Sequence, residues 1–341
     1  MRLFRCTTCN QLVFFENSTC LGCSGELIFD PATLQITTTP PGQPGGKCAG
    51  GAPGCNWKAT TDHRQCRSCA LTVTELYPTG TVQAERWGQL ENAKRRVLYS
   101  LLRLGLPIDG LRFSFPETGM TGHENGMVTI VLSEADDAER ERRRVDLHES
   151  FRTLIGHFRH ECGHYYFSCI PANSPGLLRV RELFGNEEAD YSTALQSYYR
   201  QGAPPGWING YISAYASAHP YEDWAETWAH YLHITDALEV AWAWGVAMQP
   251  QASGRGIQEP LLTLHRSSAP LPTSAMSFSS ILEAWLPISC FANSLNRSIG
   301  LQDWYPFVIN PAVTKKLDLI HALIPELGRS PSRAYGVVTA A

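Results

Sequence analysis

Eight of the chain's eleven cysteines lie between residues 6 and 69, and this cluster limits how the N-terminal region can fold. The first four form two CxxC pairs with ten residues between them, Cys6 with Cys9 and Cys20 with Cys23. A CxxC pair on a tight turn directs two sulfurs at one cation, and two such turns give the tetrahedral four-sulfur cage that zinc accepts. In a reducing compartment such a cluster favours metal over disulfides. The spacing therefore predicts a zinc site.

The other four cysteines of the cluster are Cys48, Cys55, Cys66 and Cys69. Only the last two form a CxxC pair, but glycines between Cys48 and Cys55 permit a wide loop. His63 is an alternative ligand. We expect the four sulfurs to bind a second zinc ion. The competing interpretation is that some of these cysteines are free or form a redox pair.

Short apolar runs at residues 12–15 and 26–29 read as strands and complete the layout of a zinc ribbon. A region as small as residues 1–75 buries too little apolar area to fold alone, so bound zinc would supply the missing folding free energy. Its six basic and five acidic side chains nearly cancel, which gives no support for nucleic-acid binding. A protein partner that docks on the ribbon fits this composition at least as well.

Length and composition restrict the rest of the chain. Its 341 residues, 43% of them apolar, suit a main domain plus a smaller one. The net charge of −4 lacks the basic excess of a polyanion-binding protein. No run of about 18 apolar residues predicts a membrane span, and residues 1–6 lack the apolar stretch of a secretory signal. We therefore expect a cytoplasmic protein.

Hydrophobic periodicity predicts the elements that follow the ribbon. A helix is expected over residues 81–104, and strands over residues 111–115 and 126–132. The charged run at residues 134–144 is expected to be a solvated loop or helix start. A second helix is expected from about residue 146 to residue 167. Further helices are predicted downstream, over residues 181–199, 278–295 and 311–327.

The helix predicted over residues 146–167 contains the motif HExxH, formed by His160, Glu161 and His164. Histidines four residues apart project side by side from a helix, so both imidazoles can reach one zinc ion. The glutamate between them can reach a water on that zinc. The competing interpretation is a pair of histidines that serves only packing or solvation. His157 shares their face, but we do not assign it to the metal.

A catalytic zinc usually has three protein ligands and one open position. Pro220 suits the first turn of a helix that runs to about His233, and this helix carries Glu222 and Glu226 on one face. A carboxylate pair on a mostly apolar helix is well explained as a metal ligand and its neighbour. Glu222 is the preferred third ligand and Glu226 is the alternative. Asp223 points away from their face.

The pairing of HExxH with a downstream Glu-x-x-Ala-Glu helix resembles the gluzincin metallopeptidases, including anthrax lethal factor. Together with the N-terminal ribbon, the stretch from His219 to Trp228 is similar to a bacterial family of zinc-binding metallopeptidases. In the lethal-factor pattern the first glutamate of the pair binds zinc. A tyrosine seven residues earlier, here Tyr215, stabilises the oxyanion. The 57 residues between His164 and Glu222 exceed the thermolysin-like spacing, so a thermolysin substrate pocket is not implied.

These inferences predict an α+β protein with a zinc ribbon over residues 1–75. A mostly helical, zincin-like metallopeptidase domain with a small sheet is expected over residues 80–330, and a tail over residues 331–341. We expect one catalytic zinc ion and one or two structural ones.

The expected activity is hydrolysis of a protein or peptide substrate. Glu161 would act as general base and Tyr215 would donate a hydrogen bond to the oxyanion. The strand at residues 126–132 would present its edge to an extended substrate. The alternative function is a non-catalytic adaptor that binds protein or nucleic acid through its ribbon and carries a dormant peptidase-like domain.

Overall fold

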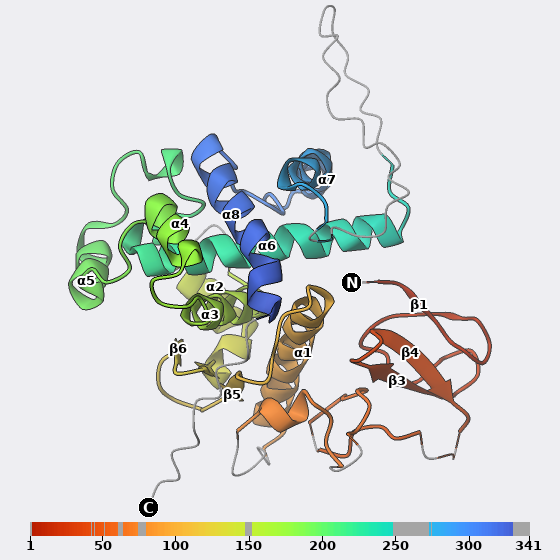
Figure 1. Ribbon diagram of the computed structural model, residues 1–341. Helices are drawn as coiled ribbons and strands as arrows, with labels where there is room; N and C mark the ends of the chain where they lie inside the picture. The colour runs from red at the N-terminus through yellow and green to blue at the C-terminus, as the bar shows by residue number, and fades with distance from the viewer. Residues whose placement is uncertain are drawn as a thin grey trace, which may run out of the picture. The chain divides into compact units, whose positions relative to one another are not determined.

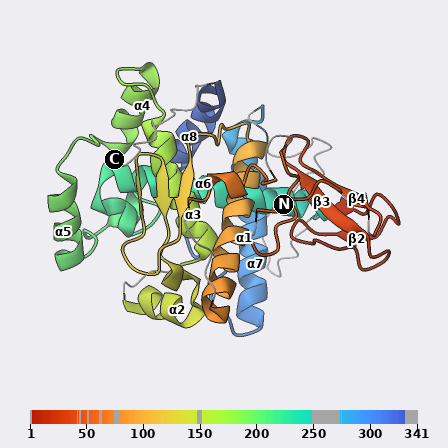
Figure 2. The same ribbon diagram turned by 90° about the horizontal axis from the view of Figure 1, so that it is seen from below.

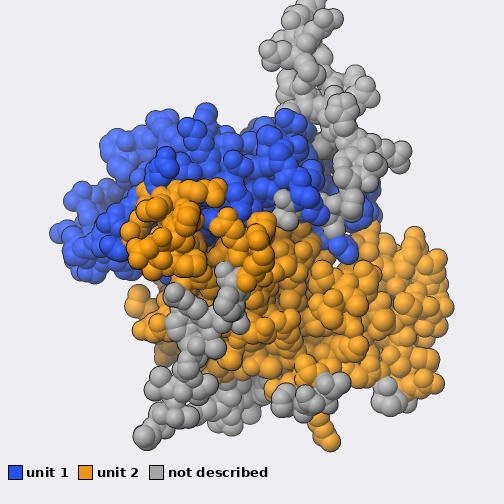
Figure 3. Space-filling model, viewed as in Figure 1, with its two compact units in different colours: residues 1–2, 182–323 blue, residues 3–181, 324–341 orange. Residues whose placement is uncertain are grey.

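The computed structural model describes residues 2–329 except 42, 44, 51, 61–63, 74–79, 147–151, 248–272 and 274. It confirms the predicted fold class, because a cysteine-rich N-terminal region precedes a mostly helical chain with small sheets (Figure 1). The chain divides into two compact units (Figure 3). One comprises residues 3–181 and 324–341, and the other comprises residues 1–2 and 182–323.

Two small antiparallel hairpins build the N-terminal region. Strand β1 (Phe4–Arg5) pairs with β2 (Leu12–Val13), and β3 (Glu26–Asp30) pairs with β4 (Gln35–Thr39). The sequence predicted β2 and β3, whose apolar residues are conspicuous. It did not predict β4, because this strand is rich in threonine and buries only one apolar side chain, Ile36.

A cluster of aromatic rings joins this region to the first long helix, α1 (Thr81–Arg103). Phe29 lies 4.9 Å from Phe15 and 5.1 Å from Trp57 between ring centroids. Tyr99 of α1 lies 5.2 Å from Phe15. All four rings are buried, and edge-on contacts of this kind are favourable beyond the area that they bury. The helix therefore completes the apolar core that the N-terminal hairpins begin.

A three-stranded mixed sheet follows α1, with the order β5–β7–β6. Strand β5 (Arg112–Ser114) is parallel to β7 (Met127–Thr129), and β6 (Gly122–Glu124) is antiparallel to it. The expectation that residues 126–132 offer a free edge is therefore wrong for Met127–Thr129, which pair on both sides. Beyond β7, the Ile130 amide donates to the carbonyl of Ser114, the last residue of β5, and the Leu132 amide donates to the Pro116 carbonyl.

The helix with the HExxH motif, α3, spans Leu154–Ser168 and packs against α1 (Figure 2). It begins eight residues later than expected, because the hydroxyl of Thr153 caps it by accepting a hydrogen bond from the Gly156 amide at 3.1 Å. Residues 147–151 of the predicted helix lie outside the described residues. The charged run before it forms a second helix, α2 (Asp137–Asp146).

The helix predicted over residues 181–199 is two helices, α4 (Pro175–Phe184) and α5 (Tyr191–Gln201). Gly185 ends the first with a φ of +100°, a conformation that glycine adopts without strain. Asp190 caps the second by accepting from the Thr193 amide at 3.1 Å. The prediction used apolar periodicity, which does not reveal the break between α4 and α5.

The last helices are α6 (Pro220–Ala243), α7 (Phe278–Ser298) and α8 (Pro311–Arg329). The sequence predicted α7 and α8 to within a few residues, whereas α6 begins where predicted but continues ten residues beyond His233. Helix α6 is buried on most sides, and its Trp224 packs against Phe184 and Trp228. A short 3-10 turn over Tyr215–Ala218 leads into it. The predicted tail at residues 331–341 lies outside the described residues. None of the described helices is long and apolar enough to cross a membrane.

Candidate metal centres

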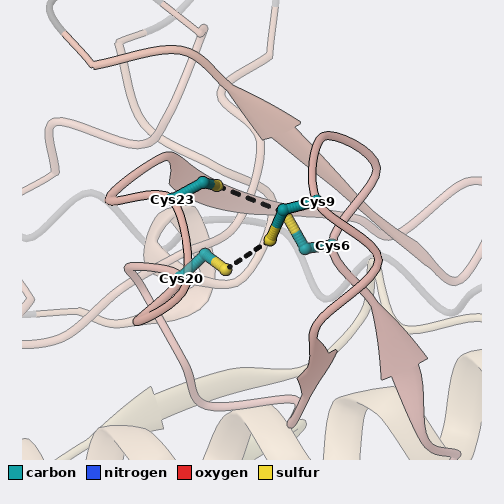
Figure 4. A group of neighbouring side chains, drawn as sticks. All are labelled: Cys6, Cys9, Cys20 and Cys23. Carbon is teal, nitrogen blue, oxygen red and sulfur yellow. Dashed lines mark hydrogen bonds between the residues drawn. The ribbon is translucent and has the colours of Figure 1, made fainter.

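The four N-terminal cysteines, Cys6, Cys9, Cys20 and Cys23, are brought together as the first tetrad (Figure 4). The sulfurs of Cys6 and Cys23 are 3.6 Å apart, as are those of Cys9 and Cys20. Sulfurs that bind one zinc ion at ~2.3 Å in a tetrahedron lie ~3.8 Å apart. The tetrad therefore has the dimensions of a four-thiolate zinc site.

Hydrogen bonds to Cys6 favour its thiolate. The Ser24 amide donates to the Cys20 carbonyl at 2.8 Å, and Ser24 itself has a φ of +58°, so the chain turns sharply at the second pair. The Thr38 hydroxyl donates to the Cys6 sulfur at 3.2 Å. Although burial opposes ionisation, this bond and the amides of Cys9 and Thr8 lower the pKa of Cys6 to about 6. Metal binding needs the deprotonated form.

The second tetrad comprises Cys48, Cys55, Cys66 and Cys69, as the sequence predicted. The Cys55 sulfur lies 3.6 Å from that of Cys66 and 3.7 Å from that of Cys69. The Cys48 sulfur accepts from the amides of Gly50 at 3.3 Å and Cys66 at 3.1 Å. These contacts also suit four thiolates around one cation. His63, the alternative ligand, lies outside the described residues.

A buried ionic group on α1 holds the chain segments of the second tetrad. Lys94 donates to the Ser68 carbonyl at 3.0 Å and to Glu91 at 2.9 Å. Arg95 donates to the Pro53 carbonyl at 3.1 Å. The sequence argument missed this group, because it interpreted α1 only through its apolar positions. Two buried cations and the buried carboxylate of Glu91 leave a net positive charge beside the tetrad, which partly balances the negative charge of its thiolates.

Helix α3 carries His160, Glu161 and His164 as neighbours on its surface. The two imidazole centroids are 4.8 Å apart with their planes at 85°, which agrees with the four-residue spacing. Glu161 and His164 are buried, and His160 is half-buried. Two adjacent imidazoles beside a buried carboxylate are groups that can bind a metal ion and accept a proton.

A third histidine, His123 of β6, stacks on His164 with a centroid distance of 6.3 Å. Its Nε2 accepts a hydrogen bond from the Gly126 amide at 3.1 Å, so the ring proton resides on Nδ1. Burial, and then His164, lower the pKa of His123 to about 4, which keeps the ring neutral at neutral pH. The sequence analysis missed this residue because it did not predict β6.

His157 faces a buried carboxylate. Its Nδ1 lies 3.3 Å from Glu134, which also pairs with Arg143 at 2.5 Å and with Arg152 at 2.9 Å. Burial opposes ionisation, but His157, Arg152 and Arg143 hold the pKa of Glu134 below its usual range. The expectation of a solvated run at residues 134–144 is therefore wrong for Glu134, which is 1% exposed.

The three acids at the start of α6 have different partners. Glu222 is 1% exposed, and its Oε1 accepts a hydrogen bond from the Tyr191 hydroxyl at 2.6 Å. Asp223 pairs with Lys316 at 2.5 Å. Glu226 accepts from the Ser213 hydroxyl at 2.6 Å. Asp223 is thus paired with a buried cation, whereas Tyr191 and Ser213 donate neutral hydroxyls to Glu222 and Glu226.

Tyr215 lies in the turn that precedes α6, with its ring 5.7 Å from that of Tyr198. Burial, and then the carboxylate of Glu222, raise the pKa of Tyr215 far above its usual range. Its hydroxyl therefore keeps its proton at any physiological pH and can act as a hydrogen-bond donor. The Tyr191 hydroxyl beside Glu222 was not predicted, since the sequence argument placed residue 191 inside a longer helix.

Two protein families together match nearly the whole length of this chain. Residues 3–79 match a zinc-ribbon domain, and residues 83–323 match a family described as "Putative zinc-binding metallo-peptidase". Uncharacterized proteins from Mycobacterium bovis and two strains of Mycobacterium tuberculosis are 40% identical to it over 344 residues. The matches cover 96% of this chain and 96% of each relative. No solved structure matches it significantly.

Proposed function

Since this chain belongs to that zinc-binding metallo-peptidase family, we propose that it hydrolyses peptide bonds with a zinc ion held by His160, His164 and Glu222. The observation that carries the proposal is the HExxH motif on α3, with adjacent imidazoles and a buried carboxylate, Glu161, on the same helix. The ligand set and the motif are those of the gluzincin type, which the lethal-factor catalytic domain also represents. The two cysteine tetrads would hold structural zinc ions.

The residues suit a catalytic rather than a structural zinc. Two neutral imidazoles and one carboxylate leave a fourth coordination position open, whereas a tetrad of thiolates fills all four. When bound, zinc supplies a Lewis acid that lowers the pKa of a coordinated water toward ~7. Glu222 is preferred over Glu226 because its position matches the first glutamate of the gluzincin pair.

Two side chains of this protein would move or hold protons during the reaction. The Glu161 carboxylate accepts a proton from the attacking water and later delivers it to the leaving amine. The protonated hydroxyl of Tyr215 donates a hydrogen bond to the oxyanion of the tetrahedral intermediate.

The substrate would bind as an extended strand along β6 rather than β7. Strand β6 lies at the end of the sheet order and pairs only with β7 among the described residues. It packs against α3, and its His123 stacks on His164. An extended peptide that adds to this edge gains backbone hydrogen bonds with little sequence preference. The Nδ1 proton of His123 is then available to a substrate carbonyl.

The test compares the wild type with Glu161→Gln on unstructured protein substrates. We expect Gln to lower kcat by about 10²–10⁴-fold, because it cannot accept the proton. Its zinc content should stay at three ions per chain, since Glu161 is not a ligand. Equal cleavage by both proteins would remove the peptidase assignment and favour the adaptor function, in which the ribbon docks a protein partner.

A further inference from the structure

We propose that Tyr191 is a positioning residue that orients the Glu222 carboxylate for the metal. The inference rests on the proposed function, because it takes Glu222 as the third ligand. It adds a residue outside the HExxH motif and outside the glutamate pair of α6. Both residues belong to the same compact unit, and one direct hydrogen bond joins them.

The hydrogen bond has the length of a strong contact to a charged oxygen. The Tyr191 hydroxyl lies 2.6 Å from Glu222 Oε1, within the range of about 2.5–2.7 Å for a hydroxyl that donates to a carboxylate. Glu222 is 1% exposed, so solvent hardly competes for this oxygen. With Oε1 held by the phenol, rotation of the carboxylate is restricted, so the group can be presented to the metal in a fixed orientation.

The position of Tyr191 is set by the start of its helix rather than by a buried helix face. None of the residues of α5 is buried, and Tyr191 itself is 42% exposed. Its ring lies edge-on to His219 at 5.2 Å and to Tyr221 at 6.3 Å. His219 caps α6, and Tyr221 lies in its first turn, which also carries Glu222.

His219 ties the two helix starts together. Its Nδ1 accepts from the Tyr221 amide at 3.1 Å and so caps α6. With Nδ1 as acceptor, the ring proton is on Nε2, which donates to the Ala189 carbonyl at 3.1 Å. Ala189 lies two residues before Tyr191. The imidazole therefore fixes the loop that delivers the phenol to the carboxylate.

A partner that orients a ligand typically changes metal affinity by about 10–100-fold when it is removed. The test therefore measures zinc affinity of the full-length chain. Wild type, Tyr191→Phe and Ser192→Ala are titrated with a chromophoric zinc chelator, and the Kd of the most weakly bound of the three zinc ions is compared. Phe removes the hydroxyl and keeps the ring. Ser192→Ala is the matched control, since it removes a hydroxyl from the same helical turn.

We expect Tyr191→Phe to raise this Kd by about 10–100-fold and Ser192→Ala to leave it unchanged. In a Glu222→Gln background the effect of Tyr191→Phe should disappear, because no carboxylate remains to be oriented. A merely structural contribution of the hydroxyl would persist in that background.

The possible failures are distinguishable. An equal Kd in wild type and Tyr191→Phe would overturn this inference and leave the proposed ligand set in place. An effect of equal size in the Glu222→Gln background would also overturn it. A zinc content that His160→Ala leaves unchanged would overturn the ligand set and this inference together.

Discussion

The N-terminal region and the unit of residues 182–323 reach stability by different means. In residues 3–73 a few aromatic side chains surround two tetrads of thiolates, and the strands are two to five residues long. In residues 182–323 long helices bury tryptophans and leucines, and a buried ion pair joins Asp223 to Lys316. A region with little apolar core depends on metal, whereas a helical core depends on packing and on paired charges.

Among the substitutions that test this comparison, loss of one thiolate should lower stability most. We expect Cys66→Ser to abolish zinc binding at the second tetrad, because structural zinc in small domains contributes on the order of 10 kcal/mol to folding. Metal analysis should show one zinc ion fewer per chain, and the thermal unfolding midpoint should fall. Cys290→Ser is the matched control, since this cysteine is exposed and far from both tetrads in sequence. An unchanged zinc content in Cys66→Ser would show that this tetrad holds no metal.

Removal of a buried cation from the helical unit should have an intermediate effect. Lys316→Met leaves Asp223 buried without its ion-pair partner, and breaking such a pair costs about 3–5 kcal/mol. Urea unfolding of the zinc-loaded protein measures the loss, with Lys315→Met at an exposed position as the control. The zinc content of the tetrads should stay the same. A variant as stable as the wild type would mean that the buried pair contributes no net stability.

A surface ion pair of the ribbon should have the smallest effect. Lys58 and Asp30 are 2.8 Å apart, but the lysine side chain is 55% exposed, so Lys58→Ala should cost less than about 1 kcal/mol. Hydrogen bonding by Lys58 lowers the pKa of Asp30. The contribution is therefore present at neutral pH and is lost as the pH falls through the pKa of Asp30. A decrease of more than about 2 kcal/mol in the free energy of unfolding, measured in urea at neutral pH, would contradict the inference that metal binding dominates the stability of the ribbon.

Features encoded by neighbouring residues could be predicted from the sequence. The cysteine spacings indicated both tetrads, and the apolar periodicity indicated α1, α6, α7 and α8. Helix α3 was predicted too, but with the wrong start, because residue Thr153 sets its boundary through a cap and not through periodicity. The pairing of Asn125 with Gly126 is a turn signal that could have revealed β6.

Features that depend on tertiary packing could not be predicted. Glu134 lies in a charged run, and only the arrangement of Arg143, Arg152 and His157 around it explains its burial. Tyr191 approaches Glu222 because the chain breaks at Gly185 and restarts at Asp190. No short sequence window contains both partners of that contact. The proposed ligand Glu222 is also far in the chain from His160 and His164, and the ligand roles of all three stay a prediction.

The turn between β6 and β7 consists of Asn125 and Gly126, whose φ angles of +48° and +80° suit a two-residue hairpin loop. This loop sets Glu124 opposite Met127 and His123 opposite Val128. Side chains alternate between the two faces of a strand, so insertion or deletion of a single residue here would turn His123 to the opposite face of the sheet. Substitution of individual side chains in this hairpin should therefore be tolerated better than a change in the length of its loop.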